Sequence, residues 1–271
     1  MNHDILHPCF NGDGCHRVSR IHLPVAPLCN LKCHYCEQTL HCVGEDMPGK
    51  TRWVLKPEQA IQQVFAKQQL DPPLGVVGIA GPGDALYNPE TFTTIDLVRK
   101  NFPQLNICLS SNGVLLPDEA SRLQALGLTH LSVTVNTTDP IQGRAIYGWV
   151  QHAGDRYFGS EAAELIITKQ LEGIAKAAAL GIRIKVNMVL IPGVNDQQAQ
   201  AVARAVKERD ACLMNIIPLI PKGGFRKWSP PLAEDLYRIR RSCEPIIAQM
   251  YHCRQCRADA CGPLTLKVSH S

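Results

Sequence analysis

The sequence predicts an α/β protein made of six consecutive βα units. Two observations carry that prediction: short apolar runs rich in β-branched residues recur along the chain, and segments with helical periodicity separate them. Such alternation places the strands side by side in a parallel sheet covered by helices. Six units fit either a closed or partly closed barrel or an open doubly wound sheet, and periodicity alone does not choose between them.

The strands and helices alternate along the chain in the order that a parallel sheet requires. Strands are expected at 20–27, 76–81, 106–111, 130–136, 183–192 and 212–220. Helices are expected at 55–70, 88–101, 117–126, 161–180, 195–210 and 231–252. Residues 149–160 are expected to form a loop inserted between the fourth strand and its helix. Function is expected where the strands end, because ligands of such sheets bind at the carboxyl edge.

Composition narrows the class of protein. Lys and Arg number 28 against 24 Asp and Glu, a net charge of +4 without the basic stripe that nucleic-acid binding needs. No run of eighteen apolar residues exists, and the first fifteen residues lack the basic and apolar regions of a secretory signal. We therefore expect a cytoplasmic protein that binds neither membrane nor nucleic acid. In that reducing compartment the 12 cysteines are expected to be ligands or catalysts, not disulfides.

Three cysteines stand close together directly after the first expected strand, spaced as Cys29-x3-Cys33-x2-Cys36. Three thiolates in one tight loop can ligate a [4Fe–4S] cluster and leave one iron open to a small molecule. A zinc site would need a fourth ligand and normally uses paired CxxC spacing. The spacing therefore favours an iron–sulfur cluster with an open iron.

This motif, with Tyr35 before its last cysteine, resembles that of the radical S-adenosylmethionine (SAM) superfamily. The resemblance implies a partial (βα)6-type TIM barrel, here with cysteine-bearing extensions at both ends. It also implies that the open iron binds SAM and that SAM is cleaved reductively to a 5′-deoxyadenosyl radical. Polar and glycine residues at the ends of the expected strands then become candidate SAM contacts: Gly81, Gly83, Asp84, Ser110, Ser111, Asn112 and Asn136.

Longer phrases resemble the NifB family of nitrogenase cofactor-biosynthesis proteins. They include HPCF (7–10), VAPLCNLKCHYC (25–36), GIAGPGDALYNP (78–89), IPGVND (191–196) and HCRQCRADA (252–260). The resemblance implies a synthase that fuses two [4Fe–4S] clusters into an eight-iron, nine-sulfur core. The central carbide would come from a SAM methyl group, transferred to a cluster sulfide and then stripped of hydrogen by the 5′-deoxyadenosyl radical.

The resemblance also implies which side chains hold the three clusters. Cys29, Cys33 and Cys36 would bind the SAM cluster. Cys9, Cys253 and Cys256 would bind one precursor cluster, and His22, Cys42 and Cys108 the other. Each set has three ligands, so each cubane would keep one open iron. Glu45 is a candidate for acid–base work near the precursors, whereas Cys15, Cys212, Cys243 and Cys261 receive no role.

The expected organisation is one radical SAM domain with an N-terminal extension at 1–19, a barrel core at 20–249 and a cluster-binding tail at 250–271. Many family members carry a further NifX-like domain after the CxxC pair, and this chain is expected to be a stand-alone monomeric form. Expected partners are SAM, an iron–sulfur donor protein and a carrier or scaffold of the NifX or NifEN type.

Two other readings stay open at this point. A radical SAM peptide maturase would also carry auxiliary clusters, although its cysteines would be concentrated in a tail and would ligate those clusters fully. A non-enzymatic iron–sulfur carrier would explain the cysteine count but not the SAM-type turns at 81–84 and 110–113.

Overall fold

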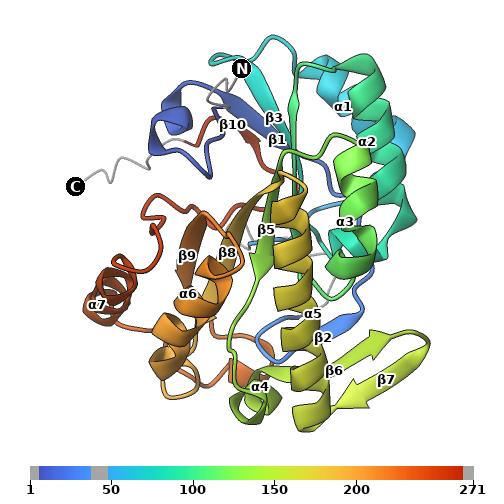
Figure 1. The fold of residues 1–271 in the computed structure, drawn as a ribbon. Coiled ribbons are helices and arrows are strands. Elements are labelled where there is room, and N and C mark those ends of the chain that lie inside the picture. The colour runs from blue at the N-terminus through green and yellow to red at the C-terminus, as the bar shows by residue number, and fades with distance from the viewer. Residues whose placement is uncertain (1–5, 38–47, 265–271) are drawn as a thin grey trace.

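A curled sheet of parallel strands forms the centre of the molecule in the computed structural model, which describes residues 6–37 and 48–264 (Figure 1). The strand order is β10-β1-β3-β4-β5-β8-β9. Its parallel strands are β1 (Ser19–His22), β3 (Leu74–Ile79), β4 (Asn106–Ser111), β5 (His130–Thr134), β8 (Arg183–Leu190) and β9 (Leu213–Pro218). The short strand β10 (Cys261–Gly262) adds to β1 in the antiparallel sense. The sheet curls without closing between β9 and β1 in the described residues, so the predicted partial barrel is confirmed and the doubly wound alternative is wrong.

Helices cover the outer face of this sheet. They are α1 (Pro57–Ala66), α2 (Pro89–Asn101), α3 (Leu116–Ala125), α5 (Gly159–Ala179), α6 (Ala199–Lys207) and α7 (Ala233–Cys243). Short 3-10 turns lie at η1 (Gly12–His16), η2 (Ala85–Tyr87), η3 (Asp196–Gln198) and η4 (Gly223–Phe225). No described helix is long and apolar enough to cross a membrane.

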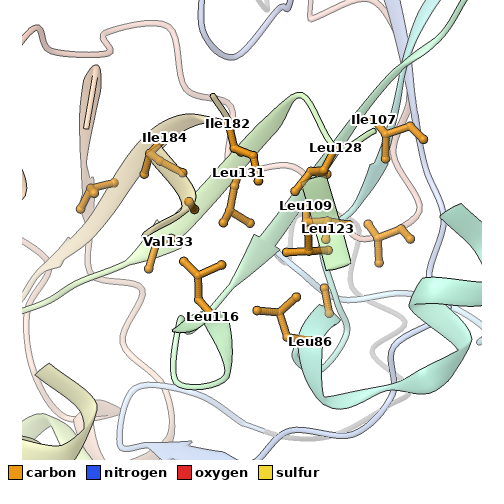
Figure 2. Close-up of a cluster of buried hydrophobic side chains, with 14 of the residues drawn as sticks. Leu86, Ile107, Leu109, Leu116, Leu123, Leu128, Leu131, Val133, Ile182 and Ile184 are labelled. Carbon is orange, nitrogen blue, oxygen red and sulfur yellow. The ribbon is translucent and has the colours of Figure 1, made fainter. Parts of the chain in front are cut away.

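The two faces of each strand have different roles: one packs in the hydrophobic core and the other faces the site. Along β4, Ile107 and Leu109 point outward to the helices, where they join Leu123 and Leu131 in a buried apolar cluster (Figure 2). The alternate residues Cys108 and Ser110 line a cavity on the inner face. Because successive side chains of a strand point to opposite faces, the apolar layer fixes the register that presents the inner residues.

Two expected elements are wrong. Residues 149–160 form no simple loop: α4 (Pro140–Ile146) leads into a hairpin of β6 (Tyr147–His152) and β7 (Asp155–Phe158), and β2 (Leu31–Cys33) adds to β6. The hairpin turns at Ala153 and Gly154, both with positive φ. The expected helix 231–252 ends at Cys243, because Pro245 has no N–H group with which to continue the helical hydrogen bonds.

Both ends of the described chain lie beside β1, next to the edge strand β10. Arg20 and Ile21 pair with Gly262 and Cys261 in β10. The N-terminal and C-terminal segments also contact each other, since His252 Nε2 donates to the Pro8 carbonyl oxygen at 3.0 Å. The blue and red ends of the chain therefore lie side by side at this edge of the sheet (Figure 1).

Candidate functional site

A cavity of about 330 Å³ opens on the inner face of the sheet. Its wall brings together residues from the N-terminal segment, the motif loop, the six parallel strands and the C-terminal segment. Six predicted metal ligands line it: Cys9, His22, Cys36, Cys108, Cys253 and Cys256. The volume lies at the lower end of the range for small-molecule sites.

The motif loop at 29–36 is held at its backbone by neighbouring elements. Within it, Leu31 and Lys32 pair with β6, and the His34 amide donates to the Ile146 carbonyl at 2.8 Å. The Gly224 amide donates to the His34 carbonyl at 2.7 Å, and the Cys36 amide closes a turn on Cys33 at 3.1 Å. The β6–β7 hairpin and η4 therefore fix the path along which Cys29, Cys33 and Cys36 are presented.

Burial sets the protonation of Cys29 and Cys33. It raises the pKa of Cys29 to about 12 and raises that of Cys33 further, with the nearby Asp84 and the other thiols adding to the effect. Polar groups point at both sulfurs: the Tyr35 hydroxyl hydrogen-bonds Cys33, and Asn112 Nδ2 lies 3.8 Å from Cys29 Sγ. Neutral thiols in the metal-free fold must release protons when they bind iron, and these donors then stabilise the thiolates.

Asp84 connects the turn after β3 to the turn after β4. Its carboxylate accepts hydrogen bonds from the amides of Leu86 (3.0 Å) and Asn112 (2.5 Å) and from the Ser111 hydroxyl (3.0 Å). The Asp84 side chain is 4% exposed, and burial raises its pKa against the lowering effect of those hydrogen bonds. In this structure the carboxylate shapes the turn that carries Asn112 to Cys29.

The other predicted SAM contacts take different positions. Ser110 lines the cavity. Asn136 is fully buried: its Nδ2 donates to the Tyr35 hydroxyl at 3.0 Å and its Oδ1 accepts from the Val189 amide at 2.9 Å. Gly83 packs so closely that a Cβ there would overlap the Leu28 carbonyl, and Gly81 has a φ of +122°. These residues hold the turns around the motif loop.

His22 and Cys108 face each other across one glycine. In the sheet His22 is in register with Gly78, and Gly78 with Cys108. A Cβ on Gly78 would lie 2.8 Å from His22 Cδ2 and 3.1 Å from Cys108 Sγ. The glycine therefore provides the space in which the imidazole and the thiol come together.

The tautomer of His22 follows from its partner. Its Nδ1 lies 2.9 Å from the Arg257 carbonyl oxygen, which can only accept, so Nδ1 carries the proton. Nε2 is left as a lone-pair donor, and burial lowers the His22 pKa to about 4, which keeps the ring neutral. A neutral imidazole oriented by a backbone carbonyl is the form in which histidine binds metals.

Cys9 and the Cys253/Cys256 pair come from opposite ends of the chain and meet at this cavity. Burial raises the pKa of Cys9, and the nearby thiols of Cys256 and Cys253 add to that effect. Arg20 Nη2 donates to Cys256 Sγ at 3.1 Å, and the Gln255 amide donates to Cys253 Sγ at 3.5 Å. Hydrogen-bond donors are therefore already in position to stabilise Cys253 and Cys256 as thiolates.

The remaining cysteines lie elsewhere. Cys15 is buried and donates to the Pro8 carbonyl, Cys243 belongs to the apolar core, and Cys212 and Cys261 are exposed. Cys42 and Glu45 lie outside the described residues. Across 6–37 and 48–264, no three His, Cys, Asp or Glu side chains converge as a single-ion site requires. The cysteines are distributed around a wall, an arrangement suited to a group of several metal atoms.

Sequence reasoning missed His7 and Lys185, which line this cavity, and Arg20, which lines a neighbouring cavity with Cys253 and Cys256. Lys185 is 6% exposed and Arg20 7% exposed, both on the inner face of strands that otherwise read as apolar. A charged residue within a predicted buried strand was the signal available for both. His7, in the HPCF phrase, carried no such signal.

Comparison with known proteins relates this architecture to a family. The radical SAM superfamily model matches residues 23–206. FeMo cofactor biosynthesis protein NifB of Klebsiella pneumoniae is 46% identical over 95% of this chain and 57% of that protein, and NifB of Herbaspirillum seropedicae is 42% identical over 95% and 50%. The chain thus spans between half and three fifths of the length of these relatives.

Solved structures share the fold at low identity. Streptococcus suis SuiB superposes with a TM-score of 0.61 at 13% identity, over 85% of this chain and 48% of that one. The protein anSMEcpe, with bound AdoMet, gives a TM-score of 0.55 at 18% identity, over 86% and 61%. The match to the superfamily model over residues 23–206 shows that the chain belongs to the radical SAM superfamily, whose members hold a [4Fe–4S] cluster and use SAM.

Proposed function

We propose that this chain synthesises the nitrogenase cofactor precursor by joining two [4Fe–4S] substrates, a carbon from SAM and one further sulfur into an eight-iron, nine-sulfur carbide core. The observation that carries the proposal is the shared cavity. It reaches from Cys36 of the motif loop to Cys9, Cys108, Cys253 and Cys256. The identity of 46% to NifB over nearly the whole chain supports the same activity.

In this proposal the resident cluster is held by Cys29, Cys33 and Cys36. The donor set fits it, because three thiols share one clamped loop and the sulfurs of Cys29 and Cys33 each already face a polar hydrogen-bond donor. When bound, the cluster supplies the electron that cleaves SAM to a 5′-deoxyadenosyl radical. The protein orients the loop through β6 and excludes water by burying the Cys29 and Cys33 sulfurs.

SAM would lie against the turns after β3, β4 and β5. Ser110 is proposed as a direct contact because it lines the cavity. Gly81, Gly83, Ser111 and Asn112 would bring backbone and side-chain polar groups to the same place. Asp84 and Asn136, whose polar atoms already hold Asn112 and Tyr35, would act chiefly by fixing these contacts.

The two substrate clusters would be held by incomplete ligand sets. Cys9, Cys253 and Cys256 would hold one, and His22 and Cys108 with Cys42 the other. Three ligands leave one iron of each cubane without a protein ligand, which suits a cluster that must react and leave. His22 is a neutral ligand, so its bond to iron carries less electrostatic attraction than a thiolate's. Glu45 remains the candidate for proton transfer near these clusters.

Delivery and release require partners. The proposal includes an iron–sulfur donor protein and a downstream carrier or scaffold of the NifX or NifEN type. The chain would act as a cytoplasmic monomer, with 20–249 as the barrel and 1–19 and 250–271 as extensions that carry cluster ligands. Their described parts both pack at the β1 edge, where Cys9, Cys253 and Cys256 meet.

A peptide maturase is the less supported alternative. SuiB has also been solved bound to its precursor peptide, but at 12% identity that likeness concerns the fold alone. Ligands that line the inner cavity from both ends of the chain favour a metal cluster as the substrate.

Cys253→Ala combined with Cys256→Ala tests the proposal. After anaerobic reconstitution the variant should hold about four fewer irons per chain, the content of one cubane, and make no eight-iron product. It should still form 5′-deoxyadenosine, because the motif loop is untouched. Cys212→Ala is the matched control, as its exposed thiol lies outside the cavity lining. Unchanged iron content in the double variant would refute the assignment.

A further inference from the structure

Lys185 is a buried cation on the cavity wall. It lies in β8 in register with Ser132 of β5, and its side chain is 6% exposed. Its ammonium group lies 5.3 Å from the centre of the Phe10 ring. The ammonium stands close enough to Cys9 and Cys108 to act on both thiols electrostatically.

No partner balances this charge within residues 6–37 and 48–264. Lys185 has neither an ion pair nor a hydrogen bond there, and Glu37 is the one described carboxylate that lines the cavity. Glu37 belongs instead to the motif-loop end, where it accepts from the Gly223 amide at 3.3 Å. The ionisable groups that interact electrostatically with Lys185 are His7, Cys9, His22, Cys108, His130 and His252, and Cys253 and Cys256 line the same cavity. None of these side chains is a carboxylate.

A second donor beside Lys185 lacks an acceptor. The Cys9 amide donates to His7 Nδ1 at 3.1 Å, so the proton of the neutral His7 ring is on Nε2. His7 Nε2 is buried without a hydrogen-bond partner, and His7 lines the cavity. Burying a cation and an N–H group without acceptors is costly, and a bound anion would remove that cost.

We propose that Lys185, assisted by His7, binds the sulfide face of the iron–sulfur substrate held by Cys9, Cys253 and Cys256. This inference rests on the proposed function and adds a positioning residue to it. A cubane bound by thiolates is an anion with sulfides as hydrogen-bond acceptors. The ammonium supplies charge-assisted hydrogen bonds to those sulfides and neutralises the thiolates around them. It therefore holds the substrate without occupying the open iron.

The test uses Lys185→Met and Lys185→Arg, each placed in a Cys29→Ala, Cys33→Ala, Cys36→Ala background so that bound iron reports on the substrate sites alone. Lys176→Met is the control, because that lysine caps the Pro117 carbonyl away from the cavity. The readouts are the rate of iron loss to a chelator after reconstitution and the Tm of the metal-free protein. Both can be measured without enzyme activity.

Lys185→Met should lose iron about tenfold faster, the effect of removing one charge-assisted hydrogen bond. It should also raise the metal-free Tm by about 3 °C or more, because an unbalanced buried charge is removed. Lys185→Arg should retain iron almost as the parent does.

The inference is overturned if Lys185→Met leaves iron release unchanged, or if it lowers the metal-free Tm, which would mean that the lysine is balanced within the fold. Its failure is separable from that of the proposed function. The latter fails when the parent background holds no iron that depends on Cys253 and Cys256.

Discussion

The motif loop and the inner cavity wall gather cysteines in opposite ways. Cys29, Cys33 and Cys36 belong to one short loop whose backbone is clamped by β6 and η4. Cys9, His22, Cys108 and Cys256 come from four separate segments that meet only after the sheet and both extensions are in place. The loop is organised locally and suits a resident cofactor. The wall depends on the whole fold and suits a substrate that arrives, reacts and leaves.

The polar groups sharpen this contrast. Beside the motif loop, the Asp84 carboxylate and both ends of the Asn136 amide make hydrogen bonds to protein groups. On the wall, Lys185 makes no hydrogen bond or ion pair to the described residues, and His7 Nε2 is buried without a hydrogen-bond partner. The Asp84 and Asn136 side chains are therefore already engaged by the protein, whereas Lys185 and His7 have donors free to bind a ligand.

Gly78→Ala should displace ligands on the cavity wall and leave the motif loop intact. The added methyl group would lie 2.8 Å from His22 Cδ2, so the imidazole must move from its place opposite Cys108. We expect the loss of about four irons per chain on reconstitution, with 5′-deoxyadenosine formation retained. Gly12→Ala is the control, because nothing lies within 4 Å of its added carbon. Full iron content in Gly78→Ala would show that this space does not matter.

Asp84→Asn should disrupt the turn beside the motif loop and leave the cavity wall intact. An amide nitrogen would face one of the backbone amides that the carboxylate now accepts from, at a cost of about 1–3 kcal/mol in the free energy of unfolding. Displacement of Asn112 from Cys29 should lower SAM cleavage about tenfold or more, whereas iron on the wall should not change. Asp96→Asn, which removes a surface pair with Lys100, provides the comparison. Equal loss of iron at both sites would contradict the division.

The same division separates the features that could be predicted from the sequence from those that could not. The proximity of Cys29, Cys33 and Cys36 could be predicted because they lie within one short segment, and β4 was predicted at its observed bounds. The meeting of Cys9 with Cys256 depends on the pairing of β10 with β1, which no local pattern encodes. The β6–β7 hairpin was missed because its exposed second strand, Asp155–Phe158, has little apolar signal. Lys185 was missed because the sequence does not show that the inner face of this parallel strand lines a cavity, so its residues are assigned to the core.

The smallest expected effect is on the pH dependence of the metal-free protein. Burial raises the pKa of Cys29 and Cys108 to about 12, so their contribution to stability is complete below about pH 8.5 and is lost as the pH rises toward 12. Burial lowers the pKa of His22 to about 4 and of His130 to about 3. Their contribution is complete above about pH 6.5 and is lost as the pH falls toward those values. The Tm should therefore be highest between about pH 6.5 and 8.5. His130→Gln should make the fall of Tm at acidic pH shallower. A Tm that keeps rising above about pH 9 would contradict this expectation.

Iron counting on a matched pair of variants tests the separation of loop and wall most directly. Replacing Cys29, Cys33 and Cys36 with alanine should abolish 5′-deoxyadenosine formation and leave the iron that depends on Cys253 and Cys256. Replacing Cys253 and Cys256 should remove about four irons and block the eight-iron product while SAM is still cleaved. These complementary losses are what the account predicts. SAM cleavage that survives the triple replacement, or a triple variant from which the further replacement of Cys253 and Cys256 removes no iron, would contradict it.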